Sequence, residues 1–233
     1  MKQALITGGA RGIGFGIAEA MLAAGYDVTV TGLTADEVAA VPQRDRLRAM
    51  PLDVTKDADV AACIAGLTQL DALVNCAGII LRDGQEFTVA GFQKVIDVNL
   101  TGTMRMCLAA KPLLEKQGGA IVNTASVWSF FGGGLVPAYT ASKGGVAQLT
   151  KALAVAWAPA IRVNAIAPGW VETELTKGAR EDTARSDAIV ARTPFGRWGQ
   201  PDDIGGAVVF LCSQDAGFIT GTVLPIDGGY TAK

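Results

Sequence analysis

The sequence contains no histidine, which removes both the commonest metal ligand and the usual general base near neutral pH. Its four cysteines lie far apart without a C-x-x-C pair, so we expect neither a disulfide framework nor a thiolate metal site. Charged residues make up only 18% of the 233, and the net charge of −2 provides no basic surface for nucleic acid or a membrane. Any acid–base chemistry must therefore use another side chain, and we expect no metal site.

The amino terminus also lacks the pattern of a secretion signal. The segment "MKQALITGG" passes directly into a strand-like run, with no charged region followed by a long apolar region and a cleavage site. Together with the unpaired cysteines, this indicates a reducing compartment. We expect a cytoplasmic protein.

What is present is an alternation of short β-rich runs with longer helix-like segments. Such alternation predicts parallel strands joined by helical crossovers, that is, a single-domain, Rossmann-type doubly wound α/β sheet of about seven strands with helices on both faces. The runs are almost entirely apolar, as in strands that are covered on both faces. No linker, repeat or low-complexity tract divides residues 1–233. The predicted strands are 3–7, 27–31, 47–53, 71–75, 120–124, 161–167 and 222–227.

The first chemical signal is the glycine-rich stretch "TGGARGIG" between the first predicted strand and the first helix. Glycines at Gly8, Gly12 and Gly14 would let a pyrophosphate approach the backbone, and the helix start would offer it free N–H groups. The alternative is a tight strand-to-helix connection without a ligand.

Small and polar residues follow the third and fourth predicted strands. Because the carboxyl ends of parallel strands meet at one edge, these residues should face the same crevice as the glycine turn. The alternative is that they only cap strands and turns. The residues are Asp53, Val54, Asn75, Ala77 and Gly78.

These motifs together resemble the short-chain dehydrogenase/reductase family over essentially the whole chain. The matching pieces are "TGGARGIG", "DV" at Asp53, "NCAG", Asn99, Ser126, "YTASK", "IAPGWVET" and "ITGTVLPIDGG", in this order. One departure is Cys76, at a position where the family more often has asparagine. The resemblance implies a nicotinamide cofactor held by the residues named above, and further by Arg11, Ile13, Pro168, Gly169, Val171 and Thr173.

The resemblance also implies a catalytic tetrad of Asn99, Ser126, Tyr139 and Lys143. Tyr139 would be the acid in reduction and the base in alcohol oxidation, and Ser126 would hold the substrate oxygen. A lysine ammonium one helical turn away should lower the tyrosine pKa from about 10 towards neutral pH. Lys143 would also bind the nicotinamide ribose, and Asn99 would fix a water in a proton relay. In an arbitrary helix, Tyr139 and Lys143 would be a solvent-exposed pair.

The substrate follows from resemblance alone. Several stretches are similar to enzymes acting on sugar acids and polyols, such as gluconate 5-dehydrogenases and 2-keto-3-deoxygluconate dehydrogenases. Other stretches are similar to 3-oxoacyl-carrier-protein reductases, which remain the alternative, and a non-catalytic dinucleotide sensor is a third. Trp128 and Trp170 are expected in the pocket. Arg82 is either a carboxylate ligand or a surface charge. Residues 174–195 are expected to form a helical lid, and apolar helices predict a homotetramer.

The cofactor prediction depends on the end of the second strand. An NAD-preferring site places a carboxylate there, where this chain has Gly32 followed by Leu33. We expect no group in this segment to repel a 2′-phosphate, and Arg11 could add a charge-assisted contact. NADP(H) is therefore favoured, and NAD(H) remains possible.

Overall fold

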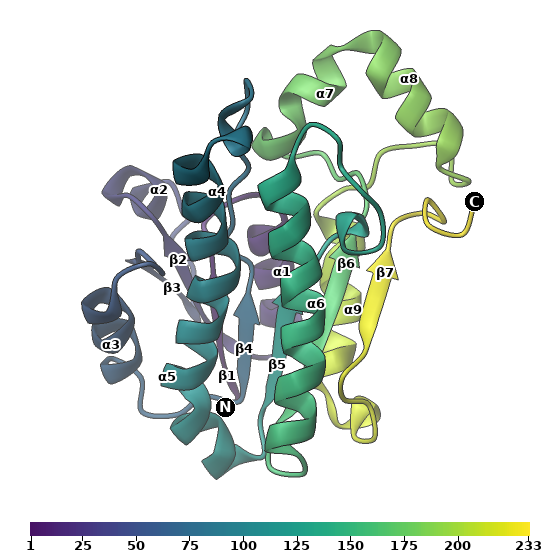
Figure 1. Cartoon of the computed structure of the whole chain (residues 1–233). Coiled ribbons are helices and arrows are strands. Elements are labelled where there is room, and N and C mark those ends of the chain that lie inside the picture. Colours follow the sequence, from purple (N-terminus) through teal and green to yellow (C-terminus); the bar gives the residue numbers. More distant parts are fainter.

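The computed structural model describes residues 1–233 and contains one parallel sheet of seven strands (Figure 1). Their order across the sheet is β3-β2-β1-β4-β5-β6-β7. The predicted Rossmann-type doubly wound sheet is confirmed. The strands are β1 (Gln3–Thr7), β2 (Asp27–Gly32), β3 (Leu47–Pro51), β4 (Ala72–Asn75), β5 (Ala120–Thr124), β6 (Arg162–Pro168) and β7 (Val223–Ile226).

Helices cover both faces of the sheet. Those on one face are α1 (Gly12–Ala23) and α9 (Asp202–Cys212), and those on the other are α3 (Asp57–Ala65), α5 (Gly102–Gln117) and α6 (Pro137–Trp157). The remaining helices are α2 (Ala35–Ala39), α4 (Val89–Ile96), α7 (Lys177–Glu181) and α8 (Thr183–Arg192). None of the helices is long and apolar enough to span a bilayer.

Successive strand residues serve opposite faces, which explains why the strand runs are apolar throughout. Leu5, Leu73 and Ile121 are register neighbours across the sheet and are fully buried against α3, α5 and α6. The next residues along each strand, Ile6 and Val74, are buried against α1 and α9. The central strands β1, β4 and β5 therefore contribute to two cores.

All strands end at the same edge, and the order of the sheet reverses direction beside β1. Strands β2 and β4 flank β1, so the turns after β1 and β4 border a crevice at the carboxyl edge. Helices α7 and α8 lie beyond this edge, at the top of Figure 1. The fold thus directs the predicted site residues towards the crevice and the predicted lid over it.

A π-helical turn interrupts the run that begins at Val89 and ends at Gln117. This turn, η2 (Asp97–Thr101), joins α4 to α5 and contains Asn99. The Thr103 hydroxyl donates a hydrogen bond of 2.7 Å to the Asn99 carbonyl oxygen. A π turn holds one more residue than an α turn, and such turns are frequent at functional sites.

Candidate active site

The turn between β1 and α1 is built for close approach to its backbone. Gly8 has φ +63°, and a Cβ there would lie 2.8 Å from the Cα of Ala77. A Cβ on Gly14 would overlap the Gly8 carbonyl oxygen. Arg11, at the N-cap of α1, makes no side-chain capping bond, and the first turn holds no acid. The free N–H groups and the positive end of the helix therefore fit a bound phosphate.

Two cavities extend from this turn along the crevice. One, of about 360 Å³, is lined by Gly8, Arg11, Gly12, Ile13, Gly14, Gly78, Tyr139, Lys143 and Thr173 among others. The other, of about 520 Å³, reaches the ends of β2 and β3 and is lined by Gly32, Leu33, Asp53, Val54 and Ala77 among others. Most of the residues predicted to hold the cofactor are therefore brought together.

A third cavity, of about 260 Å³, adjoins the first. It contains Ser126, Trp128, Gly169 and Trp170, as expected for a substrate pocket. Tyr139 and Leu175 line both this cavity and the 360 Å³ one, so Tyr139 is the titratable residue that the two share.

Three predicted cofactor residues do not line these three cavities. The Asn75 side chain donates to Asn123 Oδ1 at 2.9 Å, inside the sheet. Pro168 ends β6, and Val171, 2% exposed, lies beneath the lid, where its carbonyl oxygen accepts a hydrogen bond from Thr176. These positions support the walls of the crevice.

Lys143 and Tyr139 lie one turn apart at the start of α6, as predicted. Lys143 is buried and donates a 2.6 Å hydrogen bond to the Thr124 carbonyl oxygen, and its Nζ lies 5.6 Å from the centre of the Tyr139 ring. Burial lowers the pKa of Lys143 to about 8. The expected lowering of the Tyr139 pKa is not found. Burial raises it to about 12, because desolvation of the phenolate outweighs a hydrogen bond from Ser126.

Asn99 lies behind the other three residues of the predicted tetrad, with 1% of its surface exposed. Its Oδ1 accepts from the Ile79 N–H at 2.8 Å, and its Nδ2 donates to the Ile79 carbonyl oxygen and to Ser142 Oγ. A Cβ on Gly78 would lie 3.4 Å from Asn99 Oδ1 and 3.6 Å from Lys143 Nζ. The glycine therefore leaves open a space that both polar groups face.

A carboxylate that was not predicted as a site residue lies at the end of β2. Glu37, in the first turn of α2, accepts from the Leu33 N–H at 2.7 Å and pairs with Arg11 at 3.0 Å. The expectation that no group there repels a phosphate is therefore wrong. The acid comes from helix α2, which follows the strand. The N-cap residue of this helix is Thr34, whose hydroxyl oxygen accepts a hydrogen bond from the Glu37 N–H. An acid three residues after a threonine cap is the signal that could have found it.

The third cavity contains two arginines and no carboxylate. Arg82 donates to the Leu175 carbonyl oxygen at 2.6 Å, which joins it to the lid. Arg185, on α8, lies with its guanidinium carbon 5.7 Å from the centre of the Trp170 ring. Arg185 was not predicted, because nothing in its local sequence indicates where the lid helix points.

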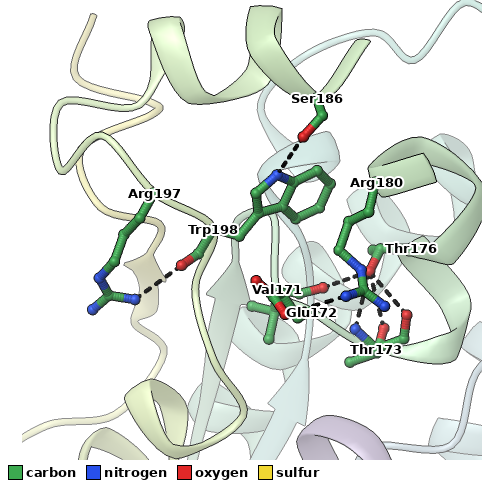
Figure 2. Close-up of polar contacts among 8 residues, drawn as sticks. All are labelled: Val171, Glu172, Thr173, Thr176, Arg180, Ser186, Arg197 and Trp198. Atoms are coloured by element: carbon green, nitrogen blue, oxygen red, sulfur yellow. Dashed lines mark hydrogen bonds and ion pairs between the residues drawn. The ribbon is translucent and has the colours of Figure 1, made fainter. Parts of the chain in front are cut away.

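The predicted lid segment is helical, as expected, and is held by contacts near its start and at Ser186 on α8 (Figure 2). Near its start, Arg180 pairs with Glu172 at 3.2 Å, and Thr176 donates to the Val171 carbonyl oxygen at 2.6 Å. On α8, Ser186 accepts a 3.0 Å hydrogen bond from the Trp198 indole. Trp170 packs edge-on between Trp128 and Trp198, with ring centres 6.0 and 5.6 Å away. The aromatic rings thus link the pocket wall to the lid.

The lowered pKa of Lys143 predicts a pH-dependent contribution to stability. In the unfolded chain Lys143 keeps its proton up to a pH of about 10.5, whereas in the folded chain it releases the proton near pH 8. The free energy of unfolding should therefore rise with pH between these values. Over this range the free energy of unfolding should increase by about 3 kcal/mol. Urea unfolding of the wild type and of Lys143→Met from pH 7.5 to 10.5 measures it. A free-energy difference between the two proteins that stays flat over this range would contradict the assignment.

A doubly wound parallel sheet with a glycine-bordered crevice and a buried lysine beside a tyrosine defines a dinucleotide-binding oxidoreductase. Comparison with known proteins narrows the class. Residues 8–231 match the family described as Enoyl-(Acyl carrier protein) reductase. The chain belongs to the short-chain dehydrogenase/reductase family, and it acts as an NAD(P)-dependent oxidoreductase on CH–OH groups.

Relatives match the chain over its whole length. It is 44% identical to the 2-dehydro-3-deoxy-D-gluconate 5-dehydrogenase of Bacillus subtilis, with 100% of this chain and 95% of the relative covered. It is 40% identical to the D-threitol dehydrogenase of Mycolicibacterium smegmatis, covering 100% and 94%. A gluconate 5-dehydrogenase from Burkholderia cenocepacia, in complex with NADP and tartrate, has a TM-score of 0.93 at 36% identity, covering 100% and 96%. The predicted similarity to the sugar-acid branch is confirmed.

Proposed function

We propose that the protein interconverts a ketone and a secondary alcohol on a sugar acid, with Tyr139 as the acid–base group. The observation that carries this is the position of Tyr139, the titratable residue shared by the cofactor cavity and the third cavity. A bound nicotinamide supplies or accepts the hydride. In reduction, Tyr139 donates its phenolic proton to the substrate oxygen. In oxidation, it takes that proton back.

Ser126, Lys143 and Asn99 complete the proposed proton path. Ser126 lies in the same cavity as Tyr139 and orients the substrate oxygen. Lys143, with a pKa lowered to about 8, can exchange a proton near neutral pH. The open space at Gly78 between Asn99 Oδ1 and Lys143 Nζ supports a relay water there. Because burial raises the pKa of Tyr139 to about 12, the phenol is protonated at neutral pH, which is the form that ketone reduction requires.

The substrate class is supported by the charges of the third cavity. Arg82 and Arg185 line it, and no acid opposes them. A guanidinium binds a carboxylate through two charge-assisted hydrogen bonds, whereas a neutral polyol leaves the positive charge unmatched. Trp128 and Trp170 provide flat walls beside these charges. We therefore favour a sugar acid over a neutral polyol.

A panel of substrates tests this assignment in both directions. We expect the highest kcat/KM for keto or hydroxy sugar acids, with neutral polyols of equal length at least tenfold lower, since a charge-assisted hydrogen bond is worth about 1.5–3 kcal/mol. Arg82→Ala and Arg185→Ala should remove most of this preference without changing turnover of the neutral polyol. A preference for threitol in the wild type would contradict the proposal.

Two other functions make different predictions in the same assay. A 3-oxoacyl-carrier-protein reductase would prefer an acetoacetyl thioester. The family description also names acyl carrier protein, although for reduction of an enoyl rather than a 3-oxoacyl group. The pocket's paired arginines and aromatic walls give a pantetheine chain no particular match. A non-catalytic sensor would bind cofactor and turn over nothing. It has little support, because all four tetrad residues are present and lie at the crevice or directly behind it.

For the cofactor, we propose NADP(H), with NAD(H) as a weaker second. Gly32 replaces the acid that would end β2, and the related gluconate 5-dehydrogenase was solved with NADP. Glu37 opposes this preference, because it occupies the Leu33 N–H and the Arg11 guanidinium, two donors that a 2′-phosphate could use. The chain therefore has the donors for a phosphate together with a carboxylate that competes for them.

Replacing Glu37 by glutamine should strengthen NADPH binding relative to NADH by about tenfold, because the carboxylate charge is removed and Arg11 is released. Titration of protein fluorescence with each nucleotide gives the two Kd values. Gly32→Asp is a poor reciprocal test, since its Cβ would lie 2.8 Å from the Cβ of Glu37. An unchanged ratio of the two Kd values in Glu37→Gln would exclude Glu37 as a determinant.

We further propose that residues 1–233 act as one cofactor-binding and catalytic domain, with 174–195 as the substrate lid. The lid's contacts to the third cavity through Leu175, Thr176 and Arg185 support this. The outer faces of α5 and α6 expose Leu108 and Val155, which supports the homotetramer implied by the family resemblance. All four cysteines are free, as a cytoplasmic location requires.

A further inference from the structure

A buried carboxylate that the proposed mechanism does not use lies between the substrate cavity and the catalytic helix. Glu86, in the short helix η1 (Gln85–Phe87), is only 2% exposed. Its Oε1 accepts a hydrogen bond of 2.9 Å from the Leu81 N–H, and its Oε2 accepts one of 2.9 Å from the Tyr139 N–H. A fully buried acid normally requires such partners, and both here are backbone groups.

The two N–H groups belong to segments that border the reacting site. Leu81 lies between Ile80 and Arg82, which both line the third cavity. Tyr139 lines both that cavity and the cofactor cavity. The other end of the Ile79–Arg82 strip is held by Asn99, which binds both the N–H and the carbonyl oxygen of Ile79. Glu86 is therefore the second anchor of this cavity wall.

The hydrogen bond from the Tyr139 N–H to Glu86 replaces a side-chain cap at the start of α6. Its N-cap, Val136, has no side chain that could accept a hydrogen bond, and Pro137 has no N–H. The Tyr139 N–H lies in the first turn and would otherwise be an unpaired donor. The negative charge of Glu86 also lies at the positive end of the helix, where it is favourable. A residue 53 positions away thus does what a local cap does in other helices.

We infer that Glu86 is a positioning residue, which fixes the distance between the Arg82 wall and Tyr139 by holding one backbone N–H of each segment on its two carboxylate oxygens. A substrate held through its carboxylate at Arg82 then presents its carbonyl to Tyr139 at a set distance. The inference rests on the proposed function, since it requires both residues to act on the substrate.

Glu86→Gln tests it, because the amide keeps the size of the side chain but offers only one acceptor oxygen for two donors. We expect kcat to fall at least tenfold and the Kd for NADPH to change less than twofold. In an Arg82→Ala background, Glu86→Gln should lower kcat less than threefold, because both residues act through the same distance between the Arg82 wall and Tyr139. If the loss of kcat in the double variant equals the product of the losses in the two single variants, the inference is overturned.

Thr88→Ala is the matched control. Thr88 caps α4 in the same connection, accepting the Gly91 N–H at 3.0 Å, and contacts neither Leu81 nor Tyr139 through its hydrogen bonds. It should lower Tm while keeping the wild-type kcat. Should Glu86→Gln fail to fold, Glu86→Asp keeps both acceptors on a shorter chain and should give an intermediate kcat. Wild-type kcat and KM in either variant would overturn the inference.

The same measurements separate the inference from the proposed function. Full activity of Tyr139→Phe and Arg82→Ala would refute the proposed function itself. If those two variants lose activity while Glu86→Gln loses no more than Thr88→Ala, only the positioning by Glu86 is refuted.

Discussion

Tyr139→Phe should lower kcat by at least a hundredfold in both directions, while the Kd for NADPH changes less than twofold. The substitution removes one oxygen atom and leaves the ring, so the shared wall of the two cavities keeps its shape. General acid–base catalysis typically contributes a factor of about 10² to 10⁴. No histidine exists in the chain to take over the proton transfer. Steady-state kinetics and a nucleotide fluorescence titration give the two quantities.

Tyr230→Phe is the matched control, because Tyr230 is a buried tyrosine of the carboxyl-terminal segment that packs on Arg192 and Phe131. It should keep the wild-type kcat. If Tyr139→Phe retains more than about a tenth of wild-type kcat, a loss below about 1.4 kcal/mol, Tyr139 is not the main acid–base group.

Gly14→Ala should weaken NADPH binding at least tenfold and lower Tm by several degrees. The new methyl group would overlap the Gly8 carbonyl oxygen and lie 2.8 Å from the Cα of Gly9, and both are backbone atoms that cannot rotate away. The turn would have to open, which moves the N–H groups at the start of α1 away from a phosphate. Overpacking of this kind typically costs about 1–3 kcal/mol.

Gly206→Ala provides the comparison for this substitution. Gly206 lies inside α9, is exposed, and has no atom within 4 Å of the position a Cβ would take. Alanine there should raise stability by about 0.5–1 kcal/mol and leave nucleotide binding unchanged. NADPH affinity in Gly14→Ala within twofold of the wild type would show that the turn does not hold the dinucleotide.

The strands and the glycine turn could be predicted from the sequence because their signals are local. The first three residues of the run 120–124 are apolar and serve both faces, and that pattern follows directly from helices covering both sides of a parallel sheet. Tyr139 and Lys143 were predicted as a pair because their spacing matches one helical turn. The pKa of Tyr139 was predicted in the wrong direction, because burial depends on the whole fold and here outweighs the favourable contacts.

Glu86 and Arg185 could not be placed from the sequence, for a common physical reason. Both reach their partners through tertiary packing, and neither lies within a recognisable motif. Glu86 contacts a residue 53 positions away, and Arg185 meets Trp170 only because α8 lies over the crevice. Surface carboxylates and surface arginines are common, so composition alone does not distinguish these two residues from solvent-exposed charges.

The π turn at Asp97–Thr101 has a consequence for the chain lengths that the fold can accept. The extra residue in this turn sets the rotation of everything after it, so that Asn99 faces Ile79 and Ser142 while Met106 and Leu114 of α5 face the sheet. Deleting one residue here would restore a regular helix and rotate α5 relative to α4 and Asn99 by about 100°. Either the asparagine or the buried side chains would then face the wrong way. Insertions and deletions are therefore expected to be tolerated in surface turns, such as the one at Gly118, but not within 97–101.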